Sequence, residues 1–232
     1  MITKEMLNTP LQACLEAFEG NPKDGVHTLV DQFELLARKM LYGGHFEVRD
    51  NSKDAILRRV FLHTVEFYFH EENGGEEDLI VYHRNKGDKQ PKPFPIGSLH
   101  THVSGIDITF EAPDASYRAS ALIRALFQVK NGNEEKYAEI ENPQKKANPT
   151  VEYRSTYLYN YLFMDMAISN GITVKWVPDS KPVGELHQGL RKNVTWFENG
   201  KKTDRQDTRP WAFSIEEFEP KLQPPKNENN IL

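Results

Sequence analysis

Apolar residues recur at steps of three and four along the first part of the chain, which is the spacing of an amphipathic helix. The pattern covers residues 10–19 and continues more regularly over residues 26–41. We therefore expect two helices in this region. Gly43 and Gly44 follow the second one, and because glycine tolerates the left-handed backbone that ends many helices, we expect these glycines to close it.

Strand-like patterns follow the two helices. Residues 45–50 alternate between polar and apolar, and residues 55–69 are rich in Val, Phe and Tyr, so the two segments predict a hairpin. A short strand is expected at 79–83. Residues 98–104 alternate again, and we expect them to pair with the strand that comes after a turn or bulge at Gly105.

The second half of the chain mixes both patterns. Residues 115–129 fit either a helix or a helix that runs into a strand, and this choice stays open. Residues 131–150 are polar and contain prolines, so they are expected to form a surface loop. A helix at about 151–169 and a strand at 172–177 come next, and shorter strand-like runs end the sequence.

This mixture predicts an α+β fold, with a curved, mainly antiparallel sheet flanked by helices in a single domain. The domain is expected to span residues 1–216. The charged, proline-bearing segment 217–232 is expected to be a flexible tail. A chain of 232 residues, of which 38% are hydrophobic, can fill one generous core.

Composition and charge narrow the class of protein. No apolar run approaches the roughly 20 residues of a membrane span, and the first residues lack a secretion signal, so no membrane partner is expected. Cys14 is the single cysteine, which excludes an internal disulfide and fits a reducing cytoplasm. The formal net charge of −5 argues against a surface that grips nucleic acid everywhere.

Local basic clusters remain candidates for phosphate contacts, although mixed-charge loops in solvent explain each cluster better when it is taken alone. Their members are Arg58, Arg59, Arg84, Lys86, Lys89, Lys92, Lys201, Lys202, Arg205 and Arg209.

Two histidines on the strand at 98–104 suggest a metal site. His100 and His102 are two residues apart, so both side chains point to the same side of a strand. Further ligands are available in Asp107, Glu66, His70 and His83. A metal-dependent hydrolase that uses His100 and His102 is therefore one hypothesis. A strand that merely exposes polar residues to solvent is the plainer one.

Short motifs between residues 35 and 126 support another interpretation through their order. They are LARKML at 36–41, VEFYF at 65–69, Asp78, HRN at 83–85, PIGSLHTH at 95–102, SGI at 104–106 and ALIRAL at 121–126, followed by RPWAFS at 209–214. This succession resembles the alkyladenine (3-methyladenine) DNA glycosylases of the mixed α/β type. The resemblance implies an enzyme of base-excision repair that hydrolyses the N-glycosidic bond of alkylated or deaminated purines in DNA, without a cofactor.

The resemblance also implies a catalytic pair. Glu66 stands where the family activates the hydrolytic water, and Arg124 matches the arginine that lies close to this carboxylate. A positioned carboxylate can take a proton from water as the glycosidic bond breaks. We therefore predict that Glu66 lies within about 5 Å of Arg124, as an oriented base requires.

Base-binding residues are implied in the same way. Tyr68 stands at one wall of the base pocket, and His83 stands where the family hydrogen-bonds the flipped nucleotide. His102 and His100 replace the two tyrosines of the strand that stacks on the base. An alkylated purine is cationic, so an aromatic sandwich binds it better than it binds a normal base.

Two differences from the family pattern predict weak binding to intact duplex. Ser104 stands at the DNA-groove position, where family members insert a tyrosine between bases, and a serine cannot act as a wedge. The acidic segment 71–78 lies where phosphate would approach, and its repulsion would grow at low salt. A non-catalytic binding domain on the same fold is therefore a further alternative.

Overall fold

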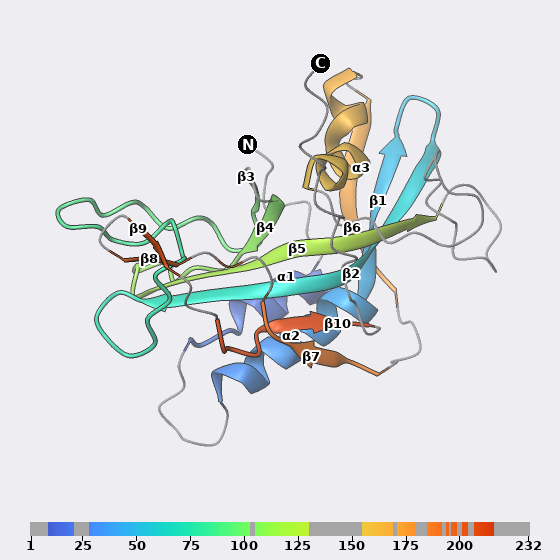
Figure 1. Ribbon diagram of the computed structural model, residues 1–232. Helices are drawn as coiled ribbons and strands as arrows, with labels where there is room; N and C mark the ends of the chain where they lie inside the picture. The colour runs from blue at the N-terminus through green and yellow to red at the C-terminus, as the bar shows by residue number, and fades with distance from the viewer. Residues whose placement is uncertain are drawn as a thin grey trace, which may run out of the picture.

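The computed structural model describes residues 9–20, 28–102, 105–129, 155–168, 171–179, 185–191, 194, 196–198, 201–203 and 207–215. These residues form a single α+β domain in which helices flank a curled antiparallel sheet, as the sequence predicts (Figure 1). The described elements are α1 (Thr9–Glu16), α2 (Leu29–Tyr42), β1 (Gly44–Asp50), β2 (Ala55–Glu71), β3 (Leu99–His102), β4 (Gly105–Thr109), β5 (Tyr117–Val129), α3 (Ser155–Ile168), β6 (Ile172–Pro178), β7 (His187–Gly189), β8 (Trp196–Glu198), β9 (Lys201–Thr203) and β10 (Ala212–Ser214).

Among the described residues, eight strands build one sheet in the order β3-β4-β5-β2-β1-β6, with β10 pairing with β2 and with β7. β2 is the central strand, because it pairs with β1 near its start, with β10 near its middle and with β5 along most of its length. β1 and β6 rise steeply from the long strands β2 and β5, so the sheet curls (Figure 1). β8 and β9 form a separate two-stranded sheet.

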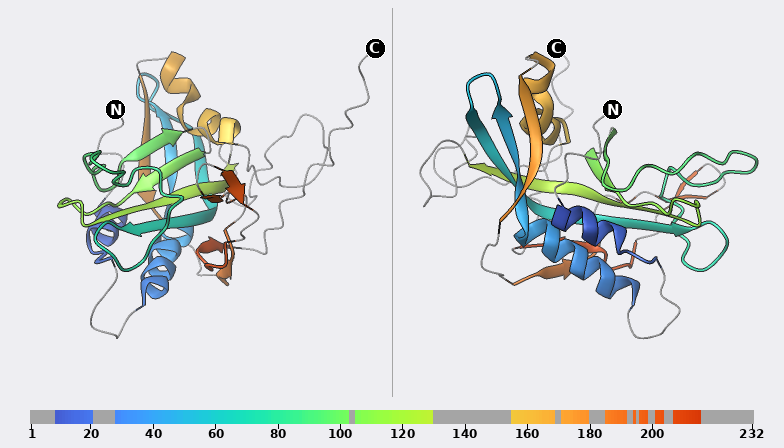
Figure 2. Two further views of the ribbon diagram at one scale, coloured as in Figure 1. Left: turned by 60° about the vertical axis from the view of Figure 1, so that its left-hand side comes forward. Right: turned by 180° about the vertical axis from the view of Figure 1, so that it is seen from behind.

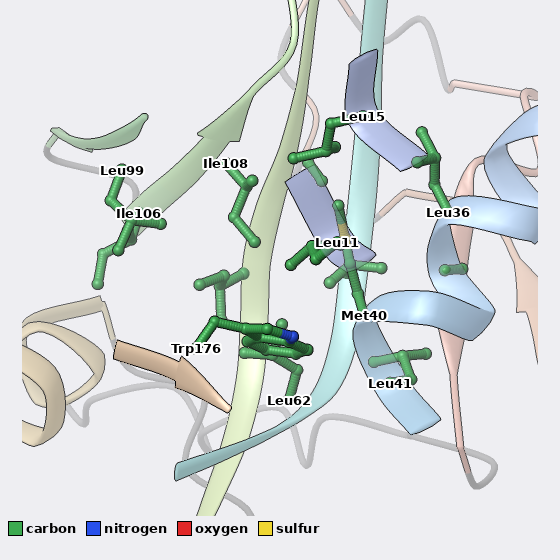
Figure 3. Close-up of a cluster of buried hydrophobic side chains, with 14 of the residues drawn as sticks. Leu11, Leu15, Leu36, Met40, Leu41, Leu62, Leu99, Ile106, Ile108 and Trp176 are labelled. Carbon is green, nitrogen blue, oxygen red and sulfur yellow. The ribbon is translucent and has the colours of Figure 1, made fainter. Parts of the chain in front are cut away.

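α1 and α2 cover one face of the long strands (Figure 2). α2 starts with a capping box, in which the Thr28 hydroxyl accepts from the Asp31 amide and the Asp31 carboxylate accepts from the Thr28 amide. Its apolar side packs on β2, where Phe33 stacks on Phe67 with ring centroids 4.5 Å apart. Figure 3 shows Met40 in this core, where aliphatic side chains of α1, β2 and β4 meet.

α3 packs against β4, β5 and β6. Its Leu158 and Leu162 belong to the same buried cluster as the side chains of α2. The helix predicted for this region is thus confirmed over the described residues Ser155–Ile168.

Alternation along β2 gives the sheet two chemically different faces. Val65, Phe67 and Phe69 point into the core beneath the helices and are fully buried. Glu66 and Tyr68 lie between them in the sequence and therefore point to the opposite side. We call this opposite side the polar face.

The strand predicted at 79–83 is wrong, because this segment is a turn. The Asp78 backbone carbonyl accepts from the Val81 amide at 3.1 Å, and the Asp78 side chain accepts from the Ile80 amide at 3.3 Å. These bonds fold the chain back and leave Tyr82 47% exposed. An aspartate that caps a turn has overridden the strand preference of the apolar residues after it.

Both alternatives for 115–129 are wrong in their helical part, because residues Tyr117–Val129 form a strand, β5. β5 lies between β2 and β4 and pairs with both. Its alanines and leucines favour a helix in isolation, and the pairing on both sides overrides that preference. The outcome matters for the site, because a strand at this position carries Arg124 next to β2.

The prediction that α2 ends with a glycine in the left-handed conformation is also wrong. Gly43 has φ −87° and ψ 1°, and Gly44 is already the first residue of β1. Glycine is needed at position 44 for space, since an added Cβ would lie 2.5 Å from the carbonyl oxygen of Val177 on β6. At Gly105 the predicted irregularity is present, with φ +148° at the start of β4.

In the part of the chain that the structure describes, no helix is long and apolar enough to cross a membrane. The predicted loop 131–150, the predicted tail 217–232 and Ser104 lie outside the described residues.

Candidate active site

One row of the sheet brings three polar side chains from different strands onto one face. Glu66 on β2 pairs with Leu122 on β5, Leu122 pairs with Asp107 on β4, and Asp107 pairs with His100 on β3. Directly paired residues point to the same side of a sheet. Strands far apart in the sequence therefore bring two carboxylates and a histidine onto the polar face.

Glu66 is held in place by two neighbours. It is 2% exposed, and its Oε2 accepts a hydrogen bond of 3.2 Å from the Tyr68 hydroxyl. The Nε of Arg124 lies 3.4 Å from its Oε1, so the predicted proximity of Glu66 and Arg124 is confirmed. The guanidinium offsets the charge of a buried carboxylate.

Tyr68 lies between Glu66 and a second arginine. Burial, and then the charge of Glu66, raises the pKa of the Tyr68 phenol well above its usual range. The hydroxyl therefore keeps its proton and acts as a donor to Glu66. The guanidinium carbon of Arg191 lies 4.6 Å from the centre of the Tyr68 ring, which is a cation–π distance.

Arg191 is the centre of a buried ion-pair network. Its Nη1 lies 2.6 Å from Asp78 Oδ2, and its Nε donates to Asp207 Oδ2 at 2.6 Å. Arg209 pairs with both aspartates, at 3.0 and 2.9 Å. The Arg191 guanidinium carbon is also 5.1 Å from the ring of Trp211. We call Glu66, Tyr68, Arg124 and Arg191 the carboxylate cluster.

Sequence reasoning did not single out Arg191. Its segment, residues 185–191, carries no motif, and its partner Asp78 lies 113 residues away in the chain. Asp78, one of the matched motifs, could have indicated that an arginine or lysine lies nearby, because a buried aspartate requires a cation. The sequence offers many arginines, and only the fold selects this one.

Five rings form a second cluster on the same face. Phe94 lies at its centre, with ring centroids 3.9 Å from His83 and 4.4 Å from His100. Tyr82 lies over both strand histidines, 5.8 Å from His100 and 5.5 Å from His102. We call these five residues the ring cluster. It contains all three histidines that the resemblance assigns to base binding, and it adds Tyr82 and Phe94.

Buried charged residues hold the ring cluster in place. His83 Nδ1 lies 3.0 Å from Glu111 Oε1, and the Phe94 amide donates to Glu111 Oε2 at 2.8 Å. The fully buried Arg118 donates to Glu111 Oε2 at 3.1 Å. His83 is therefore oriented by a carboxylate that is itself ion-paired.

The acidic segment 71–78 carries less uncompensated negative charge than the sequence suggested, because three of its carboxylates are paired with arginines. The closest nitrogen–oxygen distances are 2.9 Å for Glu72 with Arg118, 3.4 Å for Glu76 with Arg209 and 2.6 Å for Asp78 with Arg191. A fourth, Glu71, accepts from the Glu76 amide. The charge that faces an approaching phosphate is thus smaller than the residue count implies.

The metal hypothesis gains no geometric support from the described part of the chain. No group of three or more His, Cys, Asp or Glu side chains there is arranged to hold a metal ion. His70 lies near Glu72 instead, with its Nε2 3.6 Å from Oε2. Burial lowers the pKa of His100, whose ring is in contact with Phe94 and Tyr82.

No family model matches the chain, and no curated protein matches it significantly in sequence.

Proposed function

We propose that the protein is a DNA glycosylase-like hydrolase that cleaves the N-glycosidic bond of alkylated or deaminated purines. The observation that carries this proposal is Glu66, a buried carboxylate held between the Tyr68 hydroxyl and Arg124 on the same face as the ring cluster. A fixed, charged carboxylate suits the activation of water. Stacked rings suit the recognition of a planar base.

The division of labour follows from the two clusters. A base that has left its stack lies against the ring cluster, where the exposed Tyr82 offers a π-face to solvent. The sugar then lies towards Glu66, which accepts a proton from the attacking water. Arg124 keeps the carboxylate charged, and Tyr68 fixes the direction of its oxygens.

Single-stranded or loosely paired DNA is the preferred substrate in this proposal. Extrusion of a base from intact duplex costs a few kcal/mol, and Ser104 offers no aromatic wedge to offset that cost. The segment between His83 and Phe94 supplies positive charge for the DNA backbone, since Lys86 and Lys89 are both exposed and joined by a bridge of backbone hydrogen bonds.

The single cysteine, Cys14, supports action in a reducing compartment, and we place the protein in the cytoplasm on this ground.

Release of free base from defined oligonucleotides tests the proposal. The protein is incubated with single strands and duplexes that contain 3-methyladenine, hypoxanthine or ethenoadenine. We expect release by the wild type, faster from single strands, and a rate lower by about 100-fold or more for Glu66→Gln. The matched control is Glu77→Gln, which changes an exposed glutamate and is expected to keep the wild-type rate. No release from any substrate would contradict a hydrolase and favour a non-catalytic binding domain.

A further inference from the structure

Two large apolar side chains are exposed on the turn that follows β2. Leu79 and Tyr82 are 45% and 47% exposed, whereas Asp78 and Val81 of the same turn are buried. The turn lies at the end of the sheet where the last residues of β2 pair with the first residues of β5 (Figure 1). A single exposed leucine is ordinary on a protein surface, so its role depends on how it is held and on what surrounds it.

Buried contacts hold this turn in one conformation. The Asp78 carboxylate accepts from the Ile80 amide at 3.3 Å and pairs with Arg191 and Arg209 at 2.6 and 3.0 Å. The Val81 amide donates to the Asp78 carbonyl at 3.1 Å. The exposed side chains are therefore presented from a fixed backbone. A contact with a fixed surface costs little ordering of the chain, which suits such a surface to binding.

Positive charge gathers in the residues that follow Leu79. Residues 79–92 contain one acidic side chain, Asp88, and four basic ones, which are Arg84, Lys86, Lys89 and Lys92. The three lysines are exposed, and Arg84 Nε donates to the Leu79 carbonyl at 3.4 Å, which holds the guanidinium beside the turn. The whole chain has a net charge of −5. A positive segment on an acidic protein is complementary to a chain of phosphates.

The spacing of the two exposed side chains fits neighbouring nucleotides of one strand. Leu79 and Tyr82 are separated by three steps of the backbone, so their Cα atoms lie within about 10 Å of each other. Stacked bases of one strand follow each other at about 3.4 Å. A base that contacts Leu79 is therefore within about three nucleotides of a base that stacks on Tyr82.

We propose that residues 79–92 form a binding surface for single-stranded DNA, on which Leu79 contacts a base that neighbours the base at Tyr82. The placement of a base at Tyr82 rests on the proposed function. Leu79 covers part of the face of the neighbouring base, and the lysines contact the phosphates. Leucine forms no hydrogen bond with a base edge, so the contact accepts any base.

Binding of a short fluorescent single strand with a central hypoxanthine tests the surface. All proteins carry Glu66→Gln, so the strand stays intact. Leu79→Ala should raise the Kd by about 5-fold, because it removes an apolar side chain that is covered in the complex. Leu79→Met, which restores an apolar side chain, should recover most of the affinity. The matched control is Leu35→Ala, which changes a leucine 55% exposed on α2 and should leave the Kd unchanged.

Strands that lack one base distinguish a direct contact from an indirect effect. An abasic nucleotide is placed in turn at each position within about three nucleotides of the hypoxanthine, on both sides. At the position that Leu79 contacts, the abasic strand should bind the wild-type side chain and Leu79→Ala equally well, because the partner of Leu79 is missing. At the other positions the loss of about 5-fold should persist. A loss that persists at every position, or no loss with the intact strand, would overturn the proposal.

Failure of this surface and failure of the enzyme are distinguishable. Release of hypoxanthine by the wild type, with a Kd that Leu79→Ala leaves unchanged, would keep the hydrolase and refute the contact. Binding that depends on Leu79, without release by the wild type, would keep the surface and refute the hydrolase. Absence of both binding and release would refute both.

Discussion

The two clusters of the polar face lie on the same sheet and are built in opposite ways. The carboxylate cluster is almost closed to solvent, with a Glu66 side chain 3% exposed and an Arg191 side chain that is fully buried. The ring cluster holds its inner ring, His83, on a buried carboxylate and exposes nearly half of Tyr82. Charged contacts fix the first cluster, and ring stacking dominates the second.

The difference shows which task each cluster suits. Charges in a buried network cannot move without losing partners, so they hold a catalytic group in one orientation. Rings stacked at a surface accept another ring at little cost. Under the proposed function, Glu66 therefore carries out the chemistry and Tyr82 contributes to recognition of the base. The following changes test this division from the largest expected effect to the smallest.

Removal of the central cation should have the largest effect. Arg191→Met leaves Asp78 and Asp207 buried without their main partner, and we expect the free energy of unfolding to fall by about 3–5 kcal/mol. The control is Arg38→Met, whose pair with Glu34 is exposed on α2 and should contribute less than about 1 kcal/mol. Urea denaturation measures both. Similar values for the two variants would show that the carboxylate cluster is not rigidly held.

Acid sensitivity should follow from His63, a buried residue of the same strand as Glu66. Burial lowers the pKa of His63 from its ordinary value of 6.5 to about 4. Between these values the unfolded chain binds a proton that the folded chain does not, so the free energy of unfolding should fall by up to about 3 kcal/mol as the pH drops from 6.5 to 4.

Denaturation of His63→Gln across this pH range checks the origin of that loss. The slope should flatten, since glutamine does not titrate. An unchanged slope would assign the acid sensitivity to other groups.

Loss of surface charge beside the ring cluster should have the smallest effect. Lys86→Ala and Lys89→Ala should each reduce the slope of log affinity against log salt for single-stranded DNA by about 1. Lys175→Ala removes an exposed lysine on β6 and should leave the slope unchanged. Fluorescence anisotropy at several salt concentrations measures it. Equal slopes in all variants would remove this segment from the DNA-binding surface.

Local patterns in the sequence predicted much of the fold. The helices near residues 10–19 and 26–41 and the hairpin of β1 and β2 follow from periodicity alone, because each element buries its own apolar side. The turn at 79–83 and the strand at 115–129 depended on contacts outside the segment. An aspartate cap decided the first, and two neighbouring strands decided the second.

The candidate site likewise contains residues that the sequence could predict and residues that it could not. Glu66 and Arg124 could be predicted as a pair because the resemblance implies both positions, and the structure places them on the adjacent strands β2 and β5. Arg191 could not, because it reaches Asp78 through the return of a distant segment. Tyr82 was hidden inside a segment that looked like a strand, and only the turn makes it an exposed ring.

Parallel measurement of binding and single-turnover excision in Glu66→Gln and Tyr82→Ala, with a hypoxanthine-containing single strand, tests the division of tasks most directly. Glu66→Gln should bind with an unchanged Kd and excise about 100-fold more slowly or worse. Tyr82→Ala should raise the Kd by about 5- to 150-fold, the equivalent of about 1–3 kcal/mol for one stacked base, and keep the excision rate at saturation. If Glu66→Gln loses binding and rate together, or if Tyr82→Ala loses rate alone, the two clusters do not divide recognition from chemistry.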